Sequence, residues 1–159
     1  MKIKVVAIGK IKEPYLKMGI EEYVKRITPY AKIEIIEVQD SSIIDNPSEA
    51  EITKAKDDEC ARALKLIKDK EYVITLDLCK KEMSSEEFAS FMDKAFTQGG
   101  ASITFVIGGS YGLSDNMKNR ANMAISLSKM TFLHQMTRLI LLEQIYRAFK
   151  ILRGETYHK

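Results

Sequence analysis

Five short runs rich in Val, Ile and Leu are spaced along this chain, and they constrain its fold more than any other feature. They cover residues 2–8, 33–38, 72–78, 103–107 and, more weakly, 124–127. Several are continuously apolar rather than alternating, which is typical of parallel strands that are covered on both faces. Segments with helical spacing separate the runs. The sequence therefore predicts an α/β fold, with a mainly parallel sheet flanked by helices.

The helical segments between these runs carry recognisable start and stop signals. Ser84 and Glu87 have the spacing of a capping box, and Gly99 with Gly100 ends the helix that they begin. Pro14 suits a first helical turn. We expect helices over about 14–28, 48–69, 85–98, 115–122 and 135–152.

Length and composition are those of one soluble domain. The 159 residues suffice for a hydrophobic core without disulfides or metal ions, so we expect a single domain over residues 1–159. No stretch approaches the roughly 20 apolar residues of a membrane span, and the N-terminal run is too short for a signal peptide. Cys60 and Cys79 form no Cys-x-x-Cys pair and have no clustered His beside them. They suit buried or half-buried thiols in a reducing cytoplasm, and no metal site is expected.

Positive charge is concentrated in the last third of the chain. Residues 115–159 include eight basic and three acidic residues, although the whole chain has a net charge of only +3. A nucleic acid is the natural partner for such a distribution. A solvated helix face rich in Lys and Arg explains the counts equally well. The apolar side of the last expected helix suits either packing onto the sheet or a twofold dimer contact.

A glycine-rich segment in this last third suggests a pocket for a small ligand. Gly108, Gly109 and Gly112 follow an apolar run, where glycine permits a left-handed turn and close approach of a ligand to the backbone. The spacing is Gly-Gly-x-x-Gly, and no acidic residue follows at the distance at which a dinucleotide site binds ribose. A tight turn without a ligand is an equal alternative for this motif alone.

A second segment, 126–132, mixes small hydroxyl side chains with Leu, Met and Phe. An apolar slot beside main-chain polar groups suits an adenine ring, and the alternative is a turn packed beneath the last helix. Arg138 lies in the first turn of that helix, on a more polar side, next to this segment. His134 is expected to cap or pack there. No triad of nucleophile, base and orienting group is discernible.

Longer motifs extend these two segments along the chain. They are KIKVVAIGK at 2–10, VITLDL at 73–78, FVIGGSYGLS at 105–114, LSKMTF at 127–132, HQMTR at 134–138, LLEQIYRAF at 141–149 and Tyr-His at 157–158. Through these motifs the chain closely resembles the RlmH family, the smallest SPOUT (trefoil-knotted) methyltransferases. Leu133 departs from the pattern, because the family often has proline there, and this affects the expected loop geometry rather than the function.

The resemblance implies a homodimeric cytoplasmic enzyme that uses S-adenosylmethionine, without a metal or a membrane, to methylate N3 of a pseudouridine. Its substrate would be 23S ribosomal RNA of the large subunit in the assembled ribosome. The single SPOUT-like domain would be knotted over approximately residues 103–159. The residues implied to contact the methyl donor are Leu76, Gly108, Leu127, Ser128, Lys129, Met130, Thr131 and Phe132. Arg138, Tyr157 and His158 would lie near the methyl-accepting base, with a contribution across the dimer.

Methyl transfer fits this set of residues, since it needs in-line positioning but no covalent intermediate. Orientation alone supplies of order 7–11 kcal/mol in favourable intramolecular reactions. We hypothesise that His158 accepts the N3 proton, because its ordinary pKa lies nearest neutrality. Arg138 would stabilise the negative charge that develops on a base carbonyl, and Tyr157 would lie beside them.

Two other classes of function stay open on the sequence. The first is a non-catalytic ribosome- or RNA-binding module that uses the basic C-terminal helix, with salt-sensitive RNA binding and no adenosyl ligand. The second is a doubly wound enzyme that uses a nucleotide, which the missing ribose-binding acid disfavours.

Overall fold

A five-stranded sheet with parallel pairing throughout forms the centre of the molecule, in the order β2-β1-β4-β3-β5. The structure is a computed structural model that describes residues 1–42 and 44–158. The strands are β1 (Lys2–Ile8), β2 (Lys32–Val38), β3 (Tyr72–Lys81), β4 (Ser102–Ile107) and β5 (Met123–Ile125). The helices are α1 (Pro14–Ile27), α2 (Glu49–Leu64), α3 (Ser85–Gln98), α4 (Asp115–Arg120) and α5 (His134–Leu152). The predicted α/β fold class is confirmed.

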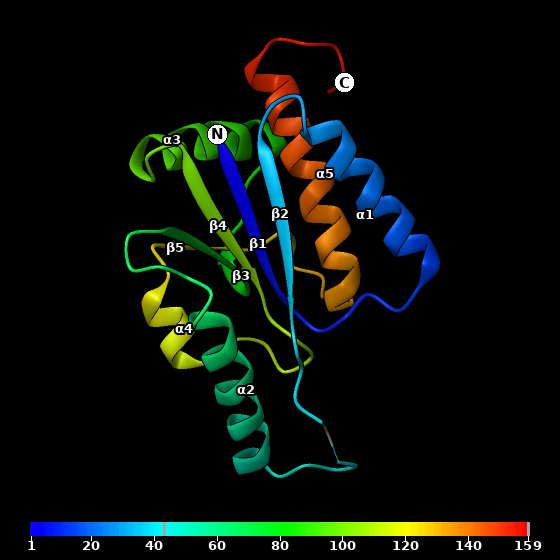
Figure 1. The fold of residues 1–159 in the computed structure, drawn as a ribbon, viewed down its shortest axis with the longest axis vertical. Helices are drawn as coiled ribbons and strands as arrows, with labels where there is room; N and C mark the ends of the chain where they lie inside the picture. The colour runs from blue at the N-terminus through cyan, green and yellow to red at the C-terminus, as the bar shows by residue number, and fades with distance from the viewer. Residues whose placement is uncertain (43, 159) are drawn as a thin grey trace.

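Helices cover both faces of this sheet (Figure 1). The side chains of β1 alternate between two apolar cores: Ile3, Val5 and Ala7 contribute to one, and Val6 and Ile8 to the other. The first core also contains residues of α1, α3 and α5, and the second contains residues of α2 and α4. Since both faces are buried, an alternating pattern would place polar groups in a core, which explains the continuously apolar runs.

Helix boundaries follow the local signals closely. Ser84 caps α3 with the predicted capping box, in which its hydroxyl accepts from the Glu87 N–H and the Glu87 carboxylate accepts from the Ser84 N–H. A second capping box, of Ser48 and Glu51, begins α2. None of the described helices is both long and apolar enough to cross a membrane.

Helix α2 ends at Leu64, five residues before the predicted end at residue 69, so that prediction was wrong. Lys65 caps the helix, and the N–H groups of Leu66 and Ile67 then bond to the carbonyls three residues before them, those of Ala63 and Leu64. The Arg120 guanidinium of α4 then donates to the carbonyls of residues 68, 69 and 71 at 2.8, 3.2 and 2.9 Å. Because Arg120 supplies hydrogen-bond donors to these carbonyls, they do not need the backbone N–H groups that a longer helix would provide.

Strand β3 is irregular where it approaches the end of β5. Ile125 is in register with both Leu76 and Lys81, so the residues between these two bulge out of the ladder. Cys79 lies in this bulge with a left-handed φ of 57°. Its thiol is exposed, which corrects the prediction of a buried or half-buried side chain, whereas Cys60 is buried as predicted.

We predict that Phe105→Ala lowers the free energy of unfolding by about 3–5 kcal/mol, measured by urea denaturation. Phe105 lies in the central strand β4, is 0% exposed and packs near the Phe88 ring. The control is Tyr15→Ala on α1, where the side chain is 59% exposed and the change should stay within about 0.5 kcal/mol. Equal losses in the two variants would contradict the described core.

Candidate functional site

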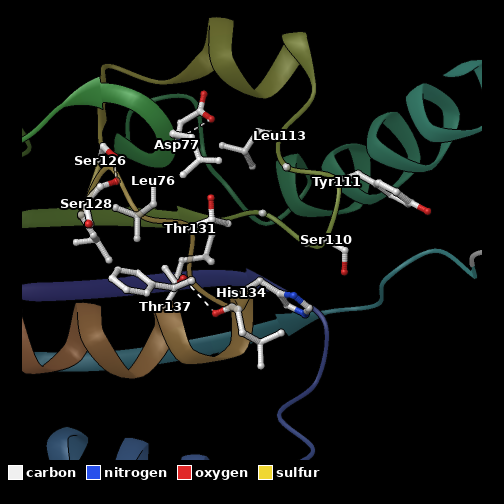
Figure 2. A pocket seen from close by; sticks show the side chains of 18 of the residues that line it. Leu76, Asp77, Ser110, Tyr111, Leu113, Ser126, Ser128, Thr131, His134 and Thr137 are labelled. Atoms are coloured by element: carbon white, nitrogen blue, oxygen red, sulfur yellow. Dashed lines mark hydrogen bonds between the residues drawn. The ribbon is translucent and has the colours of Figure 1, made fainter.

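A cavity of about 490 Å³ lies at the carboxyl ends of β3, β4 and β5 (Figure 2). This volume is in the range of small-molecule pockets. Loops after parallel strands meet at one end of the sheet, and this brings the two segments singled out in the sequence into a single cavity. The lining includes residues 76–78, 107–113, 126–128, 130–134 and 137.

The glycine turn forms one wall of the cavity. The Gly112 N–H donates to the Gly109 carbonyl at 3.0 Å, and Gly112 has a φ of +85°. A Cβ on Gly108 would lie 2.9 Å from the carbonyl carbon and oxygen of Gly112. The turn therefore needs glycine at 108 for space and at 112 for backbone conformation. It leads directly into Ser114, whose hydroxyl caps α4.

The segment 126–132 forms the facing wall and is held by its own hydroxyl groups. The Ser126 hydroxyl donates to the Ser128 carbonyl at 2.9 Å, and the Met130 N–H donates to the Ser128 hydroxyl at 3.0 Å. Apolar surface is left open here, since Met130 is 75% exposed and Phe132 is 37% exposed. Large exposed apolar groups beside backbone polar groups suit a flat heteroaromatic ligand.

Charged and titratable groups are sparse in the cavity wall. Asp77 directly follows the part of β3 that pairs with β4; its carboxylate accepts from the Leu78 N–H at 2.9 Å and lies 3.7 Å from the Lys118 ammonium of α4. Lys56 of α2 lies on the rim. His134 begins α5, and its pKa lies below the ordinary value because the ring is desolvated by burial.

Arg138 lies behind this wall and not in it. Its side chain is 1% exposed, and its guanidinium donates to the Glu37 carboxylate at 2.7 Å and to the Gly9 carbonyl at 3.0 Å. The expectation that Arg138 occupies a polar side of the helix was wrong. Burial lowers the pKa of Arg138, and the Glu37 carboxylate opposes that shift. Through these two contacts Arg138 joins the start of α5 to the end of β2, at Glu37, and to the turn after β1, at Gly9.

The C-terminal tail folds back onto α5, so that Tyr157 and His158 lie against the middle of this helix and outside the cavity lining. The Tyr157 hydroxyl donates to Glu143 at 3.2 Å, and burial is the main cause that raises the pKa of Tyr157 to about 12. The His158 ring nitrogens lie 2.7 Å from a Glu86 oxygen and 3.3 Å from an Arg147 nitrogen. Glu143 and Arg147, which contact the tail, lie nine and thirteen residues after His134, about 14 and 20 Å along the helix axis, so within one chain the tail stays outside its own cavity.

Comparison with known proteins places the chain in a family. The sequence profile of the family described as "Predicted SPOUT methyltransferase" matches residues 1–158. The chain belongs to the SPOUT methyltransferases.

Relatives that match over the full length of the chain carry a more specific name. The chain is 52% identical, over all 159 residues and all of the relative, to the protein named "Ribosomal RNA large subunit methyltransferase H" of Bacillus thuringiensis (strain Al Hakam). Its identity is 53%, again over both full lengths, to the protein of the same name from Carboxydothermus hydrogenoformans. These identities confirm the family resemblance predicted from the motifs.

A solved structure supports the SPOUT fold at low sequence identity. The putative methyltransferase from Legionella pneumophila, determined with bound SAM, aligns with a TM-score of 0.50 and 10% identity. The alignment covers 94% of this chain and 66% of that chain. The likeness concerns the fold alone.

The structure of this SPOUT protein separates the predicted residues into two groups. All the predicted donor contacts except Lys129 line the cavity, while Arg138, Tyr157 and His158 do not. Sequence reasoning missed Asp77 and Lys118. Asp77 could have been found, because it follows the buried part of a parallel strand, where ligand-binding side chains gather. Lys118 gave no such signal, since its position on a short helix says nothing about which loop it faces.

We predict that Glu37→Ala lowers the free energy of unfolding by about 1–3 kcal/mol, because it leaves the buried Arg138 charge without its carboxylate. The Glu37 side chain is 40% exposed, so the loss is smaller than for a fully buried partner. Glu22→Ala is the matched control: it breaks the exposed pair with Arg26 and should cost less than about 1 kcal/mol. Denaturant titration of both variants measures the difference, and equal values would contradict a structural role for the Arg138–Glu37 pair.

Proposed function

We propose that this protein is an S-adenosylmethionine-dependent methyltransferase of large-subunit ribosomal RNA. Its proposed reaction is methylation of N3 of a pseudouridine in 23S RNA of the assembled ribosome. The proposed enzyme is a cytoplasmic homodimer, and its C-terminal part is knotted at about residues 103–159. One observation carries the proposal: the glycine turn and the segment 126–132, which the family resemblance assigns to the donor, line one cavity with Leu76. The names of its full-length relatives and the SAM-bound structural neighbour support it.

The residues present fit this donor. An adenine ring needs an apolar slot with main-chain hydrogen-bond groups, and Leu76, Leu127 and Phe132 supply apolar surface beside the backbone of the segment 126–132. Gly112 lines the cavity and a Cβ there would meet nothing within 4 Å, so its bare backbone lets a ribose or methionyl part approach. The donor supplies a methyl group on a positively charged sulfur, which the acceptor nitrogen attacks in line. The contribution of the protein is orientation and exclusion of water.

The proposed catalytic residues require a second subunit. Tyr157 and His158 are held against the middle of α5 and do not line the cavity of their own chain, so in this account the partner subunit brings its tail to the cavity. His158 then accepts the N3 proton, and Arg138 stabilises the charge on the base carbonyl. Because Arg138 is bonded to Glu37 and to the Gly9 carbonyl, contact with the base requires exchange of the Glu37 contact.

The charge arrangement favours the enzyme over a pure RNA-binding module. Several basic groups of α5 are paired with carboxylates: Arg138 with Glu37, Arg147 with Glu143, and Lys150 with Glu155. Paired cations attract phosphate less strongly than free ones. The basic helix alone is therefore a weaker basis for function than the cavity.

Donor binding is tested by calorimetric titration of S-adenosylmethionine into Gly108→Ala. The added Cβ lies 2.9 Å from the backbone of Gly112 and forces the turn to shift, so we expect at least a roughly tenfold weaker Kd. Gly100→Ala is the control. Gly100 also has a positive φ, of 64°, but its Cβ would meet nothing within 4 Å, and it lies at the opposite edge of the sheet. Unchanged affinity in Gly108→Ala, or no binding to the folded wild type, would contradict the donor site.

The composite site is tested by mixing subunits. Gly108→Ala has a defective cavity and an intact tail, and His158→Ala has the reverse. Each variant alone should be nearly inactive in methyl transfer to ribosomes, whereas a refolded equal mixture should recover about a quarter of wild-type activity. Half of the dimers are then mixed, and each mixed dimer has one complete site. No recovery in a mixture whose mixed dimers are verified by mass analysis would contradict the contribution across the dimer.

A further inference from the structure

His134 places an imidazole ring in the wall of the donor cavity. It is half-buried at the first position of α5 and lines the cavity together with Phe132 and Thr137. The ring rests on the turn after β1, where a Cβ on Gly9 would lie 3.5 Å from the imidazole Nε2. In Figure 2 the ring lies on the side of Ser110, away from Leu76 and the Ser126–Ser128 end of the cavity. If adenine occupies the apolar end, His134 is beside the polar, sulfur-bearing part of the donor.

The charged groups around His134 come from each neighbouring element. Arg138 follows on α5, Lys12 lies on the turn after β1, and Asp40 follows β2. Burial is the largest cause that lowers the pKa of His134, Arg138 and Lys12 act in the same direction, and Asp40 opposes them. Glu37, of β2, is paired with Arg138 at 2.7 Å.

The cavity wall adds further fixed charges, Lys56 and Lys118 against Asp77, with Asp77 and Lys118 3.7 Å apart. The cavity thus contains more positive than negative side chains. Because the pKa of His134 lies below its ordinary value, the imidazole ring itself is uncharged at neutral pH.

We propose that His134 selects the donor by charge: the neutral imidazole admits a cationic sulfonium ligand, and the imidazolium repels it. This inference rests on the proposed function, because it concerns the same cavity and the same ligand. The demethylated product, S-adenosylhomocysteine, has the same adenosyl and amino-acid groups but an uncharged sulfur. Protonation of His134 consequently opposes binding of the donor more than binding of the product.

The repulsion between the imidazolium and the sulfonium decides how donor affinity changes with pH. The folded pKa of His134 lies below the ordinary value of about 6.5, so the ring is neutral at and above neutral pH. Donor affinity is highest there and falls as the pH drops through the folded pKa. Product affinity changes less over the same interval, since no sulfonium charge faces the ring.

The experiment is calorimetric titration of both ligands into the full-length wild type, His134→Gln and His134→Lys, between about pH 5 and pH 7. In the wild type, we expect the donor Kd to weaken by roughly tenfold toward low pH and the product Kd by less than about threefold. His134→Gln should remove the difference between the two slopes. His134→Lys, with a permanent charge, should weaken donor binding relative to product binding at every pH. Thermal unfolding at each pH verifies that the variants are folded.

The outcomes separate this inference from the function on which it rests. Tight binding of both ligands with equal pH slopes in the wild type overturns the role of His134 alone. A donor-specific slope that persists in His134→Gln also overturns it, because the slope then arises from another group. Failure of both ligands to bind the folded wild type at any of these pH values overturns the proposed function and the inference together.

Discussion

The side chains of β1 alternate between two apolar cores, and helices on both faces of the sheet keep these cores away from water. The inner strands β1 and β4, buried on both faces, have no free face for polar side chains, so chemistry there is confined to the loops at the strand ends. At the carboxyl edge, the ends of β3, β4 and β5 bring together three segments that are distant in sequence. The position of the cavity follows from this constraint.

Two local devices then fix the shape of the cavity. The Gly108–Gly112 turn is closed so tightly that a single methyl group at Gly108 would collide with backbone atoms. Behind the facing side, Arg138 ties the start of α5 to Gly9 and Glu37 through a buried guanidinium. Because α5 begins directly after the segment 126–132, this tie also anchors the segment that is proposed to hold adenine. Preorganised walls reduce the entropy that a ligand loses on binding.

Much of this arrangement could be predicted from local sequence signals. The limits of β1 and of α3 follow from an apolar run and a capping box, and the motifs around Gly108 and residues 126–132 identified the cavity. The burial of Arg138 could not be predicted, because its partner Glu37 is 101 residues away in the chain. The early end of α2 depends on Arg120, which is likewise distant in sequence. Such tertiary contacts leave no periodic signal in the segment that they alter.

The position of the C-terminal tail separates what one chain can do from what a dimer is proposed to do. Glu86, Glu143 and Arg147 hold Tyr157 and His158 against the middle of α5, outside the cavity lining. The donor cavity is built within one chain, whereas the proposed acceptor site needs a tail from a second chain. If the proposed composite site is right, so small a protein binds its donor within one chain and depends on assembly for catalysis.

The central claim, that the cavity at the carboxyl edge binds S-adenosylmethionine, is tested most directly by a crystal structure of the complex. We expect the adenine ring against Leu76, Leu127 and Phe132, with the backbone of the glycine turn along the ribose and the sulfur on the side of His134. Donor density at any other surface, with this cavity empty at saturating donor, would contradict the account.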